Sequence, residues 1–240
     1  DENDDDDEND NLSFTLAAGE DLTCYVGNQG QGSITIIKDV NPDDESEWFF
    51  DISGGPNSFS DQFSLFDNGS EVYEGVAAGL YTVSEEASDN YTTAYDCIAN
   101  NESGVTSGLG TTANFEVEAG DNIVCTFTNR ANPGSISGTK WEDVNGNGDP
   151  DEGDEGIFEW LIYLFTGGEE GGLGDQVGDP VSTDEEGNYT FENVTVGDYF
   201  ICEELPEGWI QTYPQEGDET GNIEEPNLGP ICWYAEITAG

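Results

Sequence analysis

Short runs of alternating apolar and polar residues recur along the chain, and clusters of Gly, Asp, Asn and Pro separate them. Alternation with a period of two places apolar side chains on one face of a β-strand, and no long window shows the helical period. The clearest runs are SITIIKDV (33–40), EWFFDIS (47–53), GLYTVSEE (79–86), NFEVEAG (114–120) and NIVCTFTN (122–129). The pattern predicts an all-β protein.

Two parts of the chain repeat each other. GLYTVSEEASDNY (79–91) matches GDYFICEELPEGW (197–209) at its Gly, its Tyr and its paired Glu. GSITIIKD (32–39) matches GSISGTKWED (134–143), and in both the Lys is the sixth residue after the leading Gly. Because a repeat of this length is typical of duplicated structural units, we expect two homologous domains, residues 32–131 and 132–240.

A third repeat is out of step with the other two. FTLAAGEDLTCYVGNQ (14–29) matches FEVEAGDNIVCTFTNR (115–130), the end of the first domain. The second domain reaches only AEITAG (235–240), before any counterpart of NIVCTFTN. We therefore expect residues 13–31 to carry a β-strand that completes the second domain of a neighbouring copy by strand donation.

Three other interpretations of the N-terminal part stay open at this stage. Residues 1–12 are expected to be a disordered acidic leader, because they are almost all Asp, Glu and Asn. Residues 1–30 as a whole could be such a leader, or they could fold back onto their own chain. The 240 residues could also be a window of a long tandem-repeat chain in which each unit ends with the strand that begins the next.

Lys38 is one of only three basic residues, and the strand pattern turns it inward. It has the same parity as Ile34 and Ile36, so all three share one face of a strand. The same reasoning turns Glu85 and Asn129 inward near the ends of two other strands. An isolated buried ammonium is costly. A neutral lysine beside a protonated glutamic acid can instead attack an asparagine carboxamide, release ammonia and leave an amide.

These motifs resemble the collagen-adhesin B-type (Cna-B, prealbumin-like) domains of surface adhesins and pili. The resemblance rests on I-x-K-D, G-x-Y-x-x-x-E and F-x-N, and covers most of residues 33–130. It implies an Ig-like, prealbumin-like β-sandwich with a spontaneous isopeptide bond between Lys38 and Asn129, promoted by Glu85. Glu86 takes that role if the register slips by one, and a plain Lys38–Glu85 ion pair is the alternative to a bond.

The second domain repeats only part of this set. Lys140 and Glu203 correspond to Lys38 and Glu85, but the domain holds no counterpart of Asn129. The matching residue is Asn28, in the segment that precedes the first domain. If that segment is donated, Lys140 of one copy can bond Asn28 of the next, and the polymer becomes covalent.

DVNGNGDPDEGDEG (143–156) has the spacing of a calcium loop. Oxygen-bearing side chains occupy loop positions 1, 3, 5, 7, 9 and 12, and Gly148 occupies position 6, where a sharp turn is needed. The expected ligands are Asp143, Asn145, Asn147, Asp149, Asp151 and Asp154, with Glu155 as the alternative at the last position. Strand-like flanks exclude a helix-loop-helix hand.

The second domain is also similar to the calcium-binding B-repeats of serine-aspartate-repeat adhesins. The similarity covers the D-x-N-x-N-G-x-x-D loop and TDEEGNYTFENVTVGDYFICEELPEGWIQTYP (183–214). It implies that calcium is the cofactor of this domain.

Composition narrows the function further. With 54 Asp and Glu against 3 Lys and Arg, the net charge is -51, which excludes the basic surfaces that bind nucleic acid. Such a charge is typical of halophilic proteins and of acidic calcium-binding surface proteins. The chain has no His and no nucleophile–base pair, so we expect no enzyme activity beyond autocatalytic isopeptide formation. No apolar run approaches the ~20 residues that cross a bilayer.

Cysteines and glycosylation sequons favour an extracellular location. The cysteines have no C-x-x-C spacing, so disulfides are expected. Cys97 can pair with Cys125 and Cys202 with Cys232, which leaves Cys24 odd, with Cys202 or Cys232 of a neighbour as a further option. N-glycosylation sequons occur at Asn11, Asn68, Asn90, Asn101, Asn188 and Asn193.

Together these features predict a structural subunit of an extracellular, cell-surface filament. Its partners are expected to be copies of itself, joined head to tail by donated strands and stiffened by calcium, disulfides and isopeptide bonds. The alternative is an adhesin stalk that spaces a binding tip from the cell.

Overall fold

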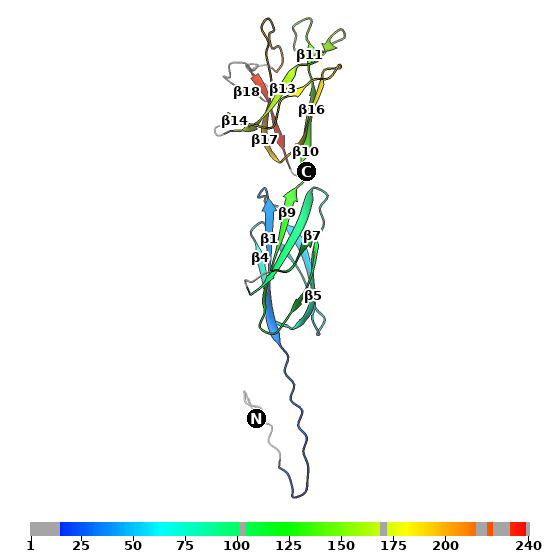
Figure 1. Cartoon of the computed structure of the whole chain (residues 1–240), viewed down its shortest axis with the longest axis vertical. Helices are drawn as coiled ribbons and strands as arrows, with labels where there is room; N and C mark the ends of the chain where they lie inside the picture. Colours follow the sequence, from blue (N-terminus) through cyan, green and yellow to red (C-terminus); the bar gives the residue numbers. More distant parts are fainter. Residues whose placement is uncertain (1–14, 101–103, 169–171, 215–219, 223–230, 239–240) are drawn as a thin grey trace, which may run out of the picture.

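The computed structural model describes residues 15–100, 104–168, 172–214, 220–222 and 231–238, and every regular element in them is a β-strand. The strands form two sandwiches that lie end to end (Figure 1). The all-β prediction is therefore confirmed. Within the described residues, no helix long and apolar enough to cross a membrane occurs. The acidic leader predicted for residues 1–12 lies outside the described residues.

The first sandwich is built from nine strands in two sheets. One sheet has the order β4-β1-β9-β6-β7 and the other β3-β2-β5-β8. The strands are β1 (Gln31–Asn41), β2 (Trp48–Gly54), β3 (Phe59–Leu65), β4 (Ser70–Ala77), β5 (Gly79–Glu85), β6 (Tyr91–Ala99), β7 (Gly104–Leu109), β8 (Thr112–Val117) and β9 (Asn122–Ala131).

Strand β1 lies inside its sheet, paired with a neighbour on each edge. It runs antiparallel to β4 and parallel to β9, with Lys38 opposite Phe127 and Val40 opposite Asn129. Alternate residues of β1 are buried, as a strand with one core face requires. Ile34 and Ile36 pack in a core with aromatic residues such as Phe50 and Phe127, where each buried side chain contributes about 1.5–3 kcal/mol.

The second sandwich follows the same order of elements but is less complete. β10 pairs with β16, β11 with β12, and the larger sheet runs β14-β13-β17-β19-β18, with β15 beside β13. The strands are β10 (Gly134–Thr139), β11 (Trp141–Glu142), β12 (Glu155–Gly156), β13 (Leu161–Gly167), β14 (Leu173–Gln176), β15 (Val181–Ser182), β16 (Asn188–Val194), β17 (Gly197–Glu203), β18 (Thr220–Asn222) and β19 (Ile231–Ile237).

One edge of β10 is unpaired in the part of the chain that the structure describes. β10 corresponds to β1, and its partner β16 corresponds to β4. In the first sandwich β9 occupies the other edge of β1, between β1 and β6. Among the described residues, no strand takes that place beside β10.

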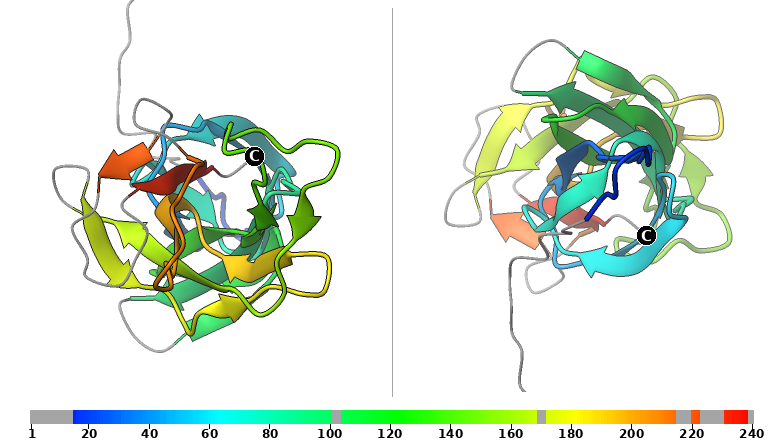
Figure 2. Two further views of the ribbon diagram at one scale, coloured as in Figure 1. Left: turned by 90° about the horizontal axis from the view of Figure 1, so that it is seen from above. Right: turned by 90° about the horizontal axis from the view of Figure 1, so that it is seen from below.

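Residues 15–30, called the N-terminal arm below, extend away from the first sandwich (Figure 1) and lie in front of it when the molecule is seen from below (Figure 2). Residues 15–29 are exposed, so the arm does not fold back onto its own chain, which was one interpretation of the sequence. The arm enters the sandwich at Gly30, whose carbonyl accepts a hydrogen bond from Ala78 N at 2.9 Å. Glycine is needed there, because a Cβ would lie 2.6 Å from the Cβ of Ala119.

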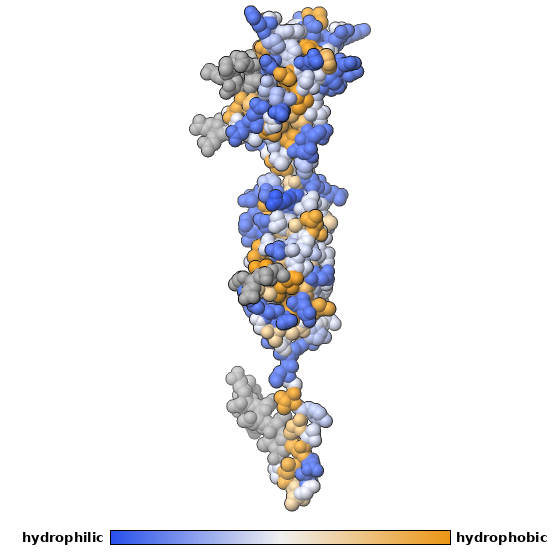
Figure 3. Space-filling view, in the orientation of Figure 1, coloured by the Kyte–Doolittle hydropathy of each residue, from blue (hydrophilic) through white to orange (hydrophobic). Residues whose placement is uncertain are grey.

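The arm carries apolar side chains into solvent. Tyr25 and Val26 are 93% and 87% exposed, and Leu16 and Leu22 are also exposed. Figure 3 shows this apolar strip below a molecule whose surface is otherwise largely polar. Leu22, Cys24 and Val26 match the inward residues of β9 in the sequence repeat, so the arm has the pattern of a sandwich strand without a sandwich around it.

Candidate functional site

Lys38, Glu85 and Asn129 meet inside the first sandwich. β1 and β9 bring Lys38 and Asn129 together in one sheet, and β5 brings Glu85 from the opposite sheet. Lys38 Nζ lies 3.0 Å from Glu85 Oε1, and neither side chain is accessible to solvent. Asn129 Nδ2 donates to the same Glu85 oxygen at 3.1 Å. The structure thus assembles the three residues that the strand parity turned inward.

Burial shifts both ionisable groups of this triad toward their neutral forms. It lowers the pKa of the Lys38 ammonium, although the nearby Glu85 carboxylate opposes that shift. It also raises the pKa of the Glu85 carboxyl, against the opposing charge of Lys38. A neutral amine is the nucleophile, and a protonated carboxyl is the proton donor, that amide formation needs.

The contacts around the triad separate the interpretations left open by the sequence. Glu86 is exposed, so Glu85 is the carboxyl of the triad and the slipped register is wrong. A plain ion pair accounts for the contact between Lys38 and Glu85, but it leaves the buried Asn129 Oδ1 without a hydrogen bond within the described residues. Amide formation would release Asn129 Nδ2 as ammonia. This nitrogen lies next to the Glu85 carboxyl, which is therefore placed to protonate it.

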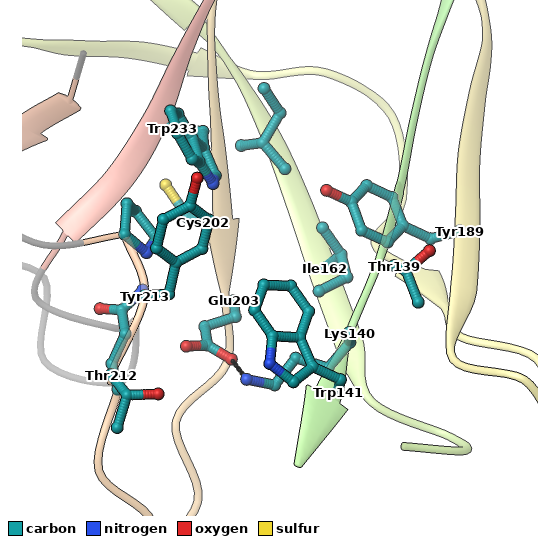
Figure 4. Close-up of a pocket in the computed structure, with 13 residues that line it drawn as sticks. Thr139, Lys140, Trp141, Ile162, Tyr189, Cys202, Glu203, Thr212, Tyr213 and Trp233 are labelled. Atoms are coloured by element: carbon teal, nitrogen blue, oxygen red, sulfur yellow. Dashed lines mark ion pairs between the residues drawn. The ribbon is translucent and has the colours of Figure 1, made fainter. Parts of the chain in front are cut away.

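The second sandwich repeats two of the three residues of the triad. Lys140 Nζ lies 2.9 Å from Glu203 Oε2, and the side chains are 20% and 7% exposed (Figure 4). The pair faces a pocket whose lining contains no Asn. The lining residues are Thr139, Lys140, Trp141, Ile162, Tyr189, Ile201, Cys202, Glu203, Gln211, Thr212, Tyr213, Pro214 and Trp233. Asn28, its counterpart in the sequence repeat, is exposed in the arm.

A tryptophan ring lies over each lysine. Trp48 is 4.7 Å from Lys38 Nζ and Trp160 is 4.9 Å from Lys140 Nζ. Sequence reasoning did not identify either ring. The signal was present, because Glu-Trp begins the matching apolar runs at 47–48 and 159–160.

The predicted calcium loop folds around its own oxygen atoms. Asp143 accepts hydrogen bonds from the backbone N–H groups of Gly146 and Gly148 at 2.6 and 2.8 Å. The amides of Asn145 and Asn147 donate to Asp151 at 2.9 and 2.6 Å. Gly146 and Gly148 have φ values of 72° and 82°, which only glycine adopts without strain.

The end of the loop is closed by Asp154. Its carboxylate accepts from Val144 N at 3.1 Å and from Asp151 N at 2.9 Å. Glu155, the alternative ligand, lies in β12 opposite Glu142. The backbone N–H of Asp149 donates a hydrogen bond to Asn147 Oδ1 at 2.9 Å. Asp154 is therefore the better placed of the two residues for loop position 12.

Hydrogen bonds tune the carboxyl groups of the loop. The pKa of Asp143 is lowered: partial burial acts to raise it, but hydrogen bonds from Gly148 N and the Thr212 hydroxyl outweigh burial. The amides of Asn145 and Asn147 lower the pKa of Asp151. Both groups are held as carboxylates, the form that binds a hard cation.

The donor set tests whether calcium fits. Within the described residues, no three His, Cys, Asp or Glu side chains approach closely enough to form a metal site by themselves. The loop instead mixes carboxylates with the carboxamides of Asn145 and Asn147. Oxygen donors of both kinds are calcium ligands, and the carboxamide oxygens of Asn145 and Asn147 accept backbone hydrogen bonds within the loop. The residues fit the ion.

Both intramolecular disulfides are present. Cys97 bonds Cys125 across β6 and β9, and Cys202 bonds Cys232 across β17 and β19. Cys24 is free and exposed. Because Cys202 and Cys232 already pair with each other, neither is available to Cys24 of a neighbour without exchange.

Four of the six sequons lie in described segments. Asn68, Asn90, Asn188 and Asn193 are all exposed. Asn11 and Asn101 fall outside the described residues. Exposure is the condition that a glycan requires, and glycosylation itself stays a prediction.

Comparison with known families agrees with the two resemblances inferred from the sequence. Residues 134–225 match the SdrD B-like domain, and residues 60–131 match a prealbumin-like fold domain. The first match contains the calcium loop, and the second contains Glu85 and Asn129. The resemblance of each domain is thereby confirmed.

Curated relatives match across both domains. Serine-aspartate repeat-containing protein F of Staphylococcus epidermidis is 31% identical over 157 residues, which cover 63% of this chain and 9% of that protein. Serine-aspartate repeat-containing protein D of Staphylococcus aureus is 28% identical over 153 residues, covering 64% and 11%. The chain thus spans about a tenth of the length of these relatives.

Solved structures give partial likenesses. The major pilin from Streptococcus pyogenes is 17% identical with a TM-score of 0.35, covering 42% of this chain and 48% of that one. A bacterial adhesin from Mobiluncus mulieris, containing intramolecular disulfide, isopeptide and ester bond cross-links, is 18% identical with a TM-score of 0.37 and covers 43% and 42%.

Proposed function

We propose that this chain is a structural subunit of an extracellular, cell-surface filament whose copies join head to tail by strand donation. One observation carries the proposal. No described strand of the second sandwich takes the place of β9, while an arm with the residue pattern of β9 extends, exposed, from the first sandwich. A sheet edge with unpaired backbone groups is a site for an added strand.

The direction of the strands makes the assembly head to tail. β1 and β9 are parallel, so the arm joins one end of the first sandwich and the chain leaves for β10 at the other end. Donor and acceptor therefore lie at opposite ends of the molecule (Figure 1). Such a contact uses two different surfaces, and repeating it gives an open fibre unless the rotation closes a ring.

The first sandwich supplies rigidity in this proposal. An amide between Lys38 and Asn129 joins β1 and β9 and replaces a buried charge with a neutral group. The disulfide between Cys97 and Cys125 joins β9 to β6. Disulfides persist in oxidising compartments, which supports an extracellular location, as does the match to SdrD B-like domains.

Calcium is proposed as the cofactor of the second sandwich. Asp143, Asn145, Asn147, Asp151 and Asp154 would hold it, with Asp149 at the remaining position. A bound divalent cation would fix the loop and neutralise part of its acidic charge. Isothermal titration of the chain should show saturable calcium binding that an Asp143→Ala, Asp151→Ala variant loses. Equal binding by both proteins would contradict the site.

A second candidate function is an adhesin stalk. It is favoured by the short span that the chain covers in its curated relatives, because two spacer domains within a long protein would look the same. Electron microscopy of the purified protein in calcium separates the two. Filaments with an axial repeat of one subunit support the filament, and isolated rods at all concentrations support the stalk and contradict our proposal.

A further inference from the structure

We propose that the pocket beside β10 receives the arm of a second copy, and that Lys140 then forms an amide bond with the partner's Asn28. This inference rests on the filament proposed above and adds the site, the register and a covalent bond between copies. The pocket, with the lining residues given above, is called the acceptor groove below.

The acceptor groove occupies the place that β9 occupies in the first sandwich. There β9 lies between β1 and β6. The groove is lined on one side by Thr139 and Lys140 at the end of β10, and on the other by residues 211–214, which follow β17 as β6 follows β5. Figure 4 shows these two sides facing each other, with Glu203 between them. A strand laid in the groove would complete the sheet.

The first sandwich gives the register of the added strand. Lys38 lies opposite Phe127 in the parallel pair, two residues before the position of Asn129. The sequence repeats place Lys140 at the position of Lys38, and Val26 and Asn28 at those of Phe127 and Asn129. Lys140 would therefore lie opposite Val26 of the partner subunit, with the partner's Asn28 two residues farther on. Leu22, Cys24 and Val26 would turn inward, which removes their apolar surface from water.

Glu203 is placed like Glu85, and one of its carboxylate oxygens has no hydrogen-bond partner within the described residues. Its Oε2 contacts Lys140 at 2.9 Å, against 3.0 Å between Glu85 and Lys38. In the first sandwich the glutamate also accepts the amide of Asn129. Glu203 Oε1 is buried and has no hydrogen-bond partner within the described residues. A buried carboxylate oxygen without a donor is costly, and the partner's Asn28 would supply the donor.

Asn28 cannot reach Lys140 of its own chain. In the same chain, Asn28 is two residues before Gly30, which is fixed to Ala78. Two residues reach at most about 7 Å. β1, with its 11 residues, spans about 36 Å, and Lys140 lies beyond the far end of that sandwich. A bond between Lys140 and Asn28 of the same chain is excluded by length, so a bond between these two residues joins two copies.

The reaction needs no further reagent. Within the contact between Lys140 and Glu203, transfer of one proton from Nζ to the carboxylate gives the amine, which attacks Cγ of the partner's Asn28 and forms a C–N bond. Glu203 takes the second proton lost by Nζ and passes a proton to the departing nitrogen. The Cγ–Nδ2 bond breaks and ammonia leaves. One amine and one carboxamide become one secondary amide and one ammonia, with no change in oxidation state.

The test uses the full chain in calcium, analysed on denaturing gels after boiling and by peptide mass spectrometry. We expect a ladder of covalent multimers and a cross-linked peptide that joins Lys140 to Asn28 with the loss of one ammonia. Lys140→Arg, which keeps the charge, and Asn28→Ala should each lose every band above the monomer. Gln29→Ala removes the neighbouring carboxamide of opposite parity and should keep the full ladder.

Mixing the two inactive variants sharpens the result. Lys140→Arg copies retain Asn28, and Asn28→Ala copies retain Lys140, so the mixture can form one bond per pair. We expect covalent dimers and no longer species. A ladder from either variant alone would overturn the assignment of the residues. A misfolded variant would fail to form dimers in the mixture, which identifies it.

Strand donation and bond formation are detected by two separate measurements. Cys24 is exposed in the free chain and should resist alkylation once the arm is seated in the groove. Filaments in which Cys24 is protected but which boil to monomers would overturn the covalent bond and leave the proposed filament standing. Monomers with reactive Cys24 under all conditions would overturn both.

Discussion

The two sandwiches begin with matching strands, β1 and β10, and differ at the second edge of those strands. In the first, β9 is part of the same chain, and Lys38, Glu85 and Asn129 are all buried together. In the second, the edge of β10 is open, Lys140 is one-fifth exposed, and Glu203 lacks its amide partner. The difference lies in whether the described sandwich contains the strand and the asparagine that complete the triad.

The largest effect is expected when the second sandwich is given its own last strand. Extending the chain after Gly240 with a copy of residues 20–29 places a β9-like strand next to β19, as β9 follows β8 in the first sandwich. An intramolecular strand has a high effective concentration, so it should fill the acceptor groove and abolish filaments.

Light scattering and electron microscopy would measure this outcome. The matched control carries the same extension with Leu22, Cys24 and Val26 of the copy changed to Asp. It cannot bury those positions and should assemble like the unmodified chain. Filaments of normal length from the extended, unaltered sequence would show that the groove is not the acceptor.

The next largest effect is expected from replacing each of the two lysines in turn, and the loss of stability should differ between them. Lys38→Met removes the amine from a fully buried site and leaves Glu85 without its partner; breaking a buried pair in this way costs about 3–5 kcal/mol. Lys140→Met removes a partly exposed cation and should cost less in the isolated subunit. Denaturant unfolding of each domain, followed by its tryptophans, gives both values. Equal losses would contradict the difference in burial that separates the sites.

A somewhat smaller and nearly equal effect is expected for the disulfides. The bonded cysteines are 28 and 30 residues apart, and closing loops of that length stabilises a fold by about 3–4 kcal/mol in the chain-entropy model. Cys97→Ser with Cys125→Ser, and Cys202→Ser with Cys232→Ser, should lower the unfolding free energy of their own sandwich by similar amounts. An effect confined to one pair would show that the bridges differ in strain or in folding role.

The smallest effect on stability is expected when the pH is lowered, and it concerns two carboxyl groups of the second sandwich. Asp143 and Asp151 have a pKa lowered by hydrogen bonds in the folded loop. Their contribution to stability is therefore complete above the ordinary carboxyl pKa of about 4 and is lost as pH falls through the lower folded values. Carbon-detected NMR titration of the Asp side chains should show both midpoints below those of exposed carboxyls. Midpoints at the ordinary value would contradict the loop geometry.

The sequence was most informative where a strand has one buried face. A period of two leaves a single choice of side for Lys38, Glu85 and Asn129, and the structure places all three inward. The sequence repeat also indicated that the arm has the residue pattern of β9, because Leu22, Cys24 and Val26 match the inward residues of that strand; donation of the arm stays a prediction. The fixed spacing of Asp and Asn similarly indicated which side chains converge in the loop at 143–154.

Other parts of the site could not be read from a pattern. Thr212 and Tyr213 line the acceptor groove from a segment without regular strand alternation, so no period fixes the direction of their side chains. Their position depends on contacts made after folding: Thr212 bonds Asp143, and the Tyr213 ring packs against Trp141. The first contact joins the loop at 143–154 to one side of the groove, and the second joins the two sides of the groove.

The parallel pairing of β1 with β9 also determines how the molecule would respond to a pulling force. Tension along a fibre would enter at the start of β1 and leave from the end of β9 toward β10. With an amide between Lys38 and Asn129, the load crosses from one strand to the other through covalent bonds. The residues between those two positions, which include most of the first sandwich, would then carry almost no load. The force could not unfold and extend them.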